Sequence, residues 1–407
     1  MSQRRHGVPA WLGRIPRNKR PTYPRRRGDL EIEVAIVGGG LSGCATAYAF
    51  AAAGIPVALL EAASIGQAST AGSTGLLMQE PGIDYVDVEA RYGRRAARRI
   101  WQMSRRATLD LAATLRRLRI RCQLETRDAI YFTHSENDVV RLRRELSARR
   151  TAGLDATWLT RDRLARATNL AAFGGIRTRG NAQVDPYRMC LGFAAAAAKR
   201  GAAVYERSPV TRIRPHRKGV DVKSEGGTVR AQRVIVATGT TTPLFEPLAR
   251  HLDEAHTYVV LTPPLGAKLR AQLGQRDAML WDAEDPSHYL RWTRDDRIMF
   301  GGADQPVPPT RRREKTLVQR TGQLMYELST LYPAVSGIQP DYAWASSVAT
   351  TADGLPYIGP HRYFPRHLFA LGLGHDGLTA GFLASRVLLR YHQDGPAKGD
   401  ELLGFTR

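Results

Sequence analysis

The sequence predicts an α/β fold whose first domain is built on a parallel sheet, and three observations near its start support this. Residues Val34 to Val37 form an uninterrupted apolar run rich in β-branched side chains, as a strand buried on both faces does. A Gly-x-Gly-x-x-Gly turn follows directly, from Gly38 to Gly43. A second apolar strand ends in Glu61, about 20 residues further on. Together these features are typical of a Rossmann-like dinucleotide-binding unit.

Each glycine of this turn has its own physical role. Gly38 allows the tight turn, and Gly40 lets the backbone approach a pyrophosphate. Gly43 lets the helix predicted over residues 41–53 pack closely on the strand. The first N–H groups of that helix point at the phosphates, and Glu61 can accept hydrogen bonds from a ribose diol. The unit therefore predicts a bound dinucleotide.

Length and composition place the chain among ordinary globular proteins. Its 407 residues are enough for two domains with substantial cores. Three widely spaced cysteines predict neither a disulfide framework nor a metal site, which favours a reducing, cytoplasmic compartment. No apolar run approaches the roughly 20 residues needed to span a bilayer.

The strongest compositional signal is a formal net charge of +22. Such a field would attract anionic substrates, the surface of a phospholipid membrane or RNA. Aromatic residues are not interleaved with the basic ones, so nucleic-acid binding is not expected, whereas peripheral contact with a membrane surface stays open. The basic, proline-rich segment 1–29 lacks the apolar core of a secretory signal and predicts a partly ordered arm lying on the folded body.

Further elements follow along the chain. Residues 66–77 are small and hydroxyl-rich, which predicts a loop that closes around a ligand. Basic helices are predicted over 88–120 and 136–150, and Pro186 opens an Ala-rich helix. Short strands then lead to Ala-Thr-Gly239. The remaining predicted elements are a helix at 316–331, a strand at 368–371, a glycine loop at 372–377 and a helix at 378–391.

The order of these motifs resembles the FAD-dependent D-amino-acid oxidase (DAO-type) superfamily from about residue 30 to the end. The resemblance is carried by the glycine turn, the Ser/Thr-Gly loop, Tyr289-Leu-Arg291 with Gly301-Gly302, and Thr351 to Gly359. The stretch 288–302 most resembles the gamma-glutamylputrescine oxidase-like branch. The Ala-Asp-Gly-Leu-Pro segment is also similar to D-amino-acid dehydrogenases.

The resemblance implies a discontinuous two-domain architecture. It has a glutathione reductase-like FAD-binding domain of the DAO subclass and a mixed-sheet α+β substrate domain. The FAD-binding domain would comprise residues 30–90, 180–250 and 340–407. The substrate domain would comprise residues 91–179 and 251–339.

The resemblance also implies contacts along the whole length of FAD. The adenine half would meet Glu61 and Val210, and the pyrophosphate would lie along the glycine turn. Ordinary turn chemistry remains an alternative for Ser69, Thr70 and Thr74. The full predicted set of FAD-binding residues is Gly38, Gly40, Leu41, Ser42, Gly43, Glu61, Ser69, Thr70, Thr74, Gly75, Leu76, Val210, Gly239, Leu373, Gly374, His375, Asp376, Gly377, Leu378 and Thr379.

The sequence departs from its relatives at several functional positions. The loops that tether FAD through His or Cys in some relatives contain neither residue here, which predicts noncovalent FAD. The two arginines that clamp a substrate carboxylate in glycine oxidase-like members are replaced by Val348 and His375. Arg291 could substitute if it points inward, although an outward charge on an alternating strand is an equal alternative. The predicted substrate-binding residues are Tyr289, Arg291 and Tyr258.

The predicted activity is FAD-dependent oxidation of the C–N bond of a small-molecule amine or amino acid. A hydride would pass to the flavin, which carries the chemistry, and the imine would hydrolyse. No catalytic residue and no metal is predicted. Dioxygen or a quinone would reoxidise the flavin, and Met299, where sarcosine oxidase-like members carry a lysine, predicts slow reaction with dioxygen. Alternatives are a 2-hydroxy acid or modified tRNA as substrate, or a flavoprotein subunit of a hetero-oligomeric dehydrogenase.

Overall fold

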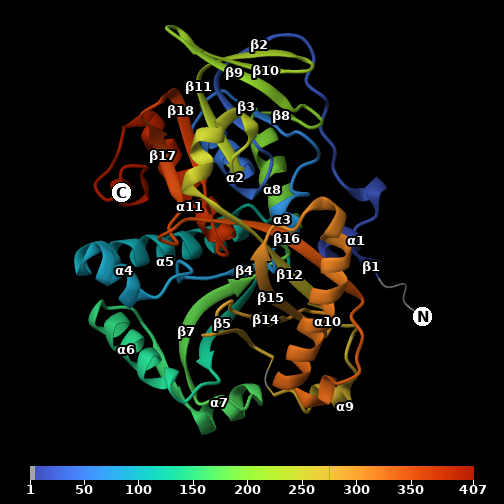
Figure 1. The fold of residues 1–407 in the computed structure, drawn as a ribbon. Coiled ribbons are helices and arrows are strands. Elements are labelled where there is room, and N and C mark those ends of the chain that lie inside the picture. The colour runs from blue at the N-terminus through green and yellow to red at the C-terminus, as the bar shows by residue number, and fades with distance from the viewer. Residues whose placement is uncertain (1–4, 275) are drawn as a thin grey trace.

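The computed structural model describes residues 5–274 and 276–407, and these are built on two sheets that lie one above the other in Figure 1. The first sheet has the strand order β17-β18-β11-β2-β3-β8, with β9 and β10 continuing from β11 as an antiparallel extension. All its neighbours from β18 to β8 pair in parallel. Its strands are β2 (Leu30–Val37), β3 (Val57–Leu60), β8 (Ala203–Tyr205), β9 (Val210–His216), β10 (Gly219–Ser224), β11 (Gly227–Gly239), β17 (Tyr357–His361) and β18 (Phe364–Leu371).

The two faces of this parallel sheet are covered differently. Phe50, Phe193 and Phe382 join one apolar cluster from three helices on one face. Val220 and Val222 of β10 pack against the central strands on the other face. Both faces are therefore buried, which is why the central strands are continuously apolar. The helices are α2 (Leu41–Ala52), α8 (Pro186–Ala198) and α11 (Gly377–Gln393).

The second sheet is mixed and has the order β1-β16-β12-β15-β14-β13-β5-β7-β4, with β6 on β7. Helix α10 (Arg313–Leu331) packs on one face, where Leu324 and Leu328 meet Val260 and Phe300. The strands are β1 (Arg5–His6), β4 (Leu76–Leu77), β5 (Glu125–Thr133), β6 (Thr157–Thr160), β7 (Gly174–Gln183), β12 (Asp253–Leu261), β13 (Ala278–Asp282), β14 (Tyr289–Trp292), β15 (Ile298–Pro306) and β16 (Tyr342–Thr350).

The linear domain boundaries of the sequence prediction differ from the sheets in three places. Strands β4 and β16 belong to the second sheet, although they fall in segments assigned to the FAD-binding domain. The arm contributes β1, which pairs in parallel with β16. Helix α5 (Arg94–Arg117) lies between the sheets in Figure 1 and buries Leu111 and Leu115 in the helical cluster of the first domain.

Local backbone chemistry explains where the basic helices break. The stretch predicted as one helix over 88–120 is two, α4 (Tyr85–Tyr92) and α5, because Gly93 has a φ of +81° between them. The remaining helices are α1 (Ala10–Gly13), α3 (Ser69–Gly72), α6 (Asp138–Thr151), α7 (Arg161–Thr168) and α9 (Ala267–Arg270). Within the described residues, none of these helices has the length and apolar character required to cross a membrane.

The N-terminal arm is packed on the body from Arg5 onward. Ala10 and Trp11 are buried in a cluster with Ala71, Met299 and Trp344. The Trp11 indole N–H donates to the carbonyl of Ser73 at 2.8 Å. The arm therefore connects the second sheet to the loop that follows α3.

Candidate active site

A cavity of about 660 Å³ extends between the two sheets, and we call it the central cavity. One end is formed by the glycine turn and the ends of β2, β3 and β11. The other end is formed by β12, β14, β15, β16 and the loop before α11. The predicted residues that line it are Gly38, Gly40, Leu41, Ser42, Glu61, Ser69, Thr70, Thr74, Leu76, Val210, Gly239, Tyr289, Leu373, Gly374, His375, Asp376, Gly377 and Leu378.

Three predicted cofactor residues support the cavity from behind instead of lining it. A Cβ at Gly43 would lie 1.8 Å from the carbonyl oxygen of Gly38, so only glycine allows this helix to approach the strand. A Cβ at Gly75 would lie 2.3 Å from the carbonyl oxygen of Val184. The hydroxyl of Thr379 donates to the carbonyl of Met78 at 3.3 Å.

The glycine-turn end of the cavity is shaped to hold a dinucleotide. Gly38 has a φ of +108°, which glycine adopts readily, and it turns the chain from β2 into α2. Glu61 accepts the backbone N–H of Gly39 at 2.7 Å and that of Ala63 at 2.8 Å. The Thr70 hydroxyl accepts the N–H of Leu41 at 3.0 Å, which closes the Ser/Thr-Gly loop over the start of the helix.

The opposite end of the cavity carries titratable side chains. Tyr289 and His375 stack with ring centroids 5.8 Å apart and an interplanar angle of 20°. His375 Nε2 lies 3.0 Å from a carboxylate oxygen of Asp304. Burial lowers the pKa of His375, but the hydrogen bond and charge of Asp304 outweigh it, so the net pKa is raised. We refer to this end, which lies opposite the glycine turn, as the reacting end of the cavity.

Asp376 shares the reacting end and differs from an ordinary surface carboxyl. Burial, followed by the nearby charge of Glu80, raises the pKa of Asp376 to about 7, although His375 opposes the shift. The described residues that line the whole cavity include no lysine or arginine. His375 is thus the one basic side chain in that described lining.

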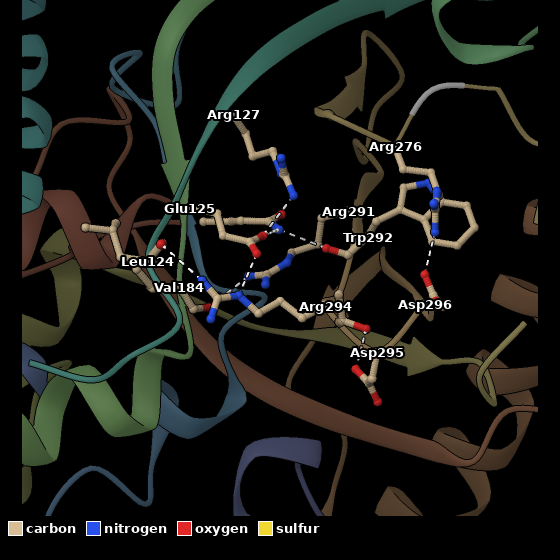
Figure 2. Close-up of polar contacts among 12 residues, drawn as sticks. Leu124, Glu125, Arg127, Val184, Arg276, Arg291, Trp292, Arg294, Asp295 and Asp296 are labelled. Carbon is tan, nitrogen blue, oxygen red and sulfur yellow. Dashed lines mark hydrogen bonds and ion pairs between the residues drawn. The ribbon is translucent and has the colours of Figure 1, made fainter.

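Arg291 does not take the place of a substrate clamp, which corrects the sequence prediction. Its Nη1 donates to the carbonyls of Thr74 at 3.0 Å, Gly75 at 3.1 Å and Val184 at 2.8 Å. In Figure 2 it lies beside Val184, in a polar group that includes Glu125. The guanidinium is buried beneath the loop and is absent from the cavity lining. Arg291 therefore holds the loop that carries Thr74.

Tyr258 and Met299 are also placed away from the reacting end. On β12 the neighbours Thr257 and Val259 line the cavity, so Tyr258 faces the opposite side of the sheet, where its hydroxyl accepts Gln305 Nε2 at 2.8 Å. Met299 is buried in the cluster beneath Trp11. Neither Tyr258 nor Met299 is among the described residues that line the cavity.

The structure adds lining residues that the sequence did not indicate. They come from three places: strands of the first sheet, the loops and short helices that follow them, and the strands β12, β15 and β16 of the second sheet. The additions are Val37, Leu60, Ala62, Ala68, Gly72, Ser73, Pro209, Thr211, Ala237, Thr238, Thr240, Thr242, Pro243, Leu244, Glu254, Thr257, Val259, Gly301, Ser346, Ser347, Val348 and Ala349.

The parallel sheet, the glycine turn and the elongated cavity define a dinucleotide-binding flavoprotein fold. The model of the FAD dependent oxidoreductase family (DAO) matches residues 33–390. The chain belongs to this family and is an FAD-dependent oxidoreductase. The glycine cradle and the Glu61 carboxylate fit the pyrophosphate and ribose of FAD, which supplies a hydride acceptor when bound.

Relatives and solved structures agree with this assignment. The chain is 25% identical to gamma-glutamylputrescine oxidoreductase of Escherichia coli (strain K12), over 91% of this chain and 86% of that protein. Glycine oxidase of Bacillus subtilis (strain 168) is 24% identical over 88% of this chain and 93% of its own length. The crystal structure of glycine oxidase from Geobacillus kaustophilus superposes with a TM-score of 0.76 at 21% identity, covering 93% of this chain and 99% of that one.

Proposed function

We propose that the protein oxidises the C–N bond of an amine that has no carboxylate on the reacting carbon. The carrying observation is the absence of lysine and arginine from the described lining of the central cavity. A hydrogen bond to a charged group contributes about 1.5–3 kcal/mol. The one basic side chain that the carboxylate of a free amino acid would find in the described lining is His375, which is already paired with Asp304. The carboxylate of the amino acid would also face Asp376 at the reacting end.

The protein side chains at this end orient the substrate and handle protons. Tyr289 and His375 form a flat wall, and Val348 adds an apolar contact on the strand β16. Amine substrates must be neutral at nitrogen when the hydride leaves the neighbouring carbon. A bound FAD would supply the hydride acceptor, and the resulting imine would hydrolyse in water to a carbonyl compound and ammonia or a smaller amine.

Matched pairs of compounds test the proposal directly. Anaerobic bleaching of the flavin is measured with amines and with the amino acids that differ from them by one carboxylate, such as tyramine with tyrosine and cadaverine with lysine. We expect the amine of a pair to bleach the flavin at least tenfold faster. A faster reaction with the amino acids, or with 2-hydroxy acids, would contradict the proposal.

FAD is proposed to be bound noncovalently, with slow reoxidation by dioxygen relative to a quinone. The described cavity lining has no cysteine, and its single histidine is held by Asp304. That ion pair also leaves little net positive charge to stabilise a superoxide-like anion. Acid precipitation should release intact FAD, and flavin retained by the precipitate would contradict noncovalent binding. Stopped-flow mixing of reduced protein with oxygenated buffer measures the rate of reoxidation by dioxygen, and a fast rate would contradict the second proposal.

The charge of +22 supports a proposed peripheral contact with anionic phospholipids. A second cleft, of about 340 Å³, presents Arg163, Arg166, Arg177 and Arg179 from α7 and β7. Within the described residues only Arg177 of these four has an acidic partner, Asp128. Flotation with phosphatidylglycerol vesicles should exceed that with phosphatidylcholine vesicles, and Arg163→Ala with Arg166→Ala should reduce it. Equal flotation with both vesicles would reject membrane contact.

A further inference from the structure

Asp376 is the N-cap residue of α11, yet its side chain makes no capping hydrogen bond. An aspartate at an N-cap ordinarily accepts a hydrogen bond from a backbone N–H of the first turn, and the carboxyl of Asp376 lacks this stabilising bond. It lines the central cavity beside His375 and Tyr289 instead. A Cβ at Gly82 would lie 2.7 Å from its Oδ2, so the glycine leaves room for this orientation.

The carboxylate of Glu80 is near enough to Asp376 for its charge to raise the pKa of Asp376. Glu80 follows β4, is 5% exposed, and neither of its carboxylate oxygens has a hydrogen-bond partner among the described residues. Arg149 forms an ion pair with it, with Nη1 3.6 Å from a carboxylate oxygen of Glu80, while the Nε of Arg149 donates to Glu145 at 2.6 Å. The negative charge of Glu80 therefore disfavours the ionised form of Asp376.

The groups facing Asp376 decide where its proton equilibrium lies. Glu80 and the burial favour the protonated carboxyl, whereas His375 favours the ionised one. Tyr289 faces it from β14, and Asp304 lies behind His375 on β15. The result is a carboxyl that changes its protonation near neutral pH, which suits a general base.

We propose that Asp376, backed by Glu80, is a catalytic base that removes the proton from the nitrogen of the substrate ammonium. This rests on the proposed amine substrate. An alkylammonium has a pKa close to that of lysine, about 10.4, so nearly all of it enters the cavity protonated. The N–H bond breaks, its electron pair stays on nitrogen, and the proton bonds to a carboxylate oxygen of Asp376. The neutral amine then loses a hydride from carbon, and the carboxyl later returns its proton to solvent.

A substrate-free titration tests the carboxyl pair on its own. The absorbance spectrum of FAD-loaded protein is recorded from pH 5 to pH 9. We expect one transition near pH 7 that is absent in Asp376→Asn and lies at least one pH unit lower in Glu80→Gln, because a neighbouring negative charge is gone. Asp87→Asn, on the exposed face of α4, should leave the transition unchanged. A transition that persists in Asp376→Asn, or that only His375→Gln removes, would overturn the proposal.

Bleaching by an amine tests the proton transfer. With the amine that reduces the flavin fastest, Asp376→Asn should slow the reaction at least tenfold at pH 7 and recover above pH 10, where the free amine predominates. A loss that is the same at every pH would show a merely structural role and reject the base. If no amine bleaches the flavin, the proposed function fails, while the titration still decides on the carboxyl pair.

Discussion

The two ends of the central cavity are built in different ways. The glycine-turn end comes largely from one continuous stretch, Gly38 to Glu61, and its key groups are backbone N–H donors and a single carboxylate. The reacting end brings together side chains far apart in sequence, such as Tyr289, Asp304 and His375. The first end is set by backbone geometry, whereas the second depends on which face each strand presents. The same cofactor-binding end can therefore be combined with reacting ends that bind many different substrates.

Gly43→Ala should have the largest effect on stability and FAD binding, because it disrupts the backbone geometry of the glycine-turn end. The added Cβ would overlap the carbonyl oxygen of Gly38, which belongs to the backbone and cannot move independently. We expect a loss of about 3 kcal/mol or more in the free energy of unfolding, measured by urea denaturation, and no retained FAD. Gly322→Ala, in open space on α10, is the control and should be neutral or stabilising. A stable, yellow Gly43→Ala protein would contradict the packing argument.

Arg291→Ala tests whether that side chain supports the loop or binds substrate. Its removal takes a donor from three carbonyls, of which that of Gly75 keeps the Val184 N–H, so we expect a loss of about 3 kcal/mol in the free energy of unfolding and weaker FAD binding. Arg294→Ala, a half-exposed arginine paired with Glu125 in Figure 2, should cost at most about 1 kcal/mol. Normal stability with impaired substrate binding would instead indicate that Arg291 binds the substrate.

Glu61→Ala should affect FAD affinity more than stability. The carboxylate lines the cavity, and the ribose would add one or two hydrogen bonds to it, each contributing about 1.5–3 kcal/mol. The dissociation constant of FAD should rise at least tenfold in equilibrium dialysis. Glu31→Ala, an exposed acid on β2, is the matched control. Unchanged FAD affinity in Glu61→Ala would show that Glu61 does not bind the ribose of FAD.

Val348→Arg should give the smallest effect and would build the missing half of a carboxylate clamp at the reacting end. One charge-assisted bond corresponds to about a tenfold to hundredfold gain in affinity. Benzoate binding, followed by its perturbation of the flavin spectrum, measures that gain. Val348→Met supplies length without charge and should not tighten benzoate. Equal affinities in the two variants would place position 348 away from the substrate.

Sequence alone predicted the parts of the site that the backbone encodes. The glycine turn, Glu61 and the loop 373–378 all line the cavity because each follows a strand whose apolar run is visible in the sequence. Tyr258 was misplaced because apolar and polar residues do not alternate cleanly along β12. The sequence therefore does not show which face meets the cavity, and a shift of one residue exchanges the two faces. Arg291 shares a face with Tyr289, yet the strand continues past the cavity and under the loop at Thr74. The buried Trp11 has no periodic signal around it at all.

Two tryptophans that hydrogen-bond to the end of α3 and to the residue after it can report whether the cavity is occupied. Trp11 and Trp344 donate their indole N–H groups to the carbonyls of Ser73 and Gly72, one residue or two before the cavity-lining Thr74. Indole emission overlaps flavin absorption, so a flavin held in the cavity quenches these nearby rings by energy transfer. Departure of FAD should therefore brighten the intrinsic fluorescence. Occupancy of the cavity can be followed in real time without a label.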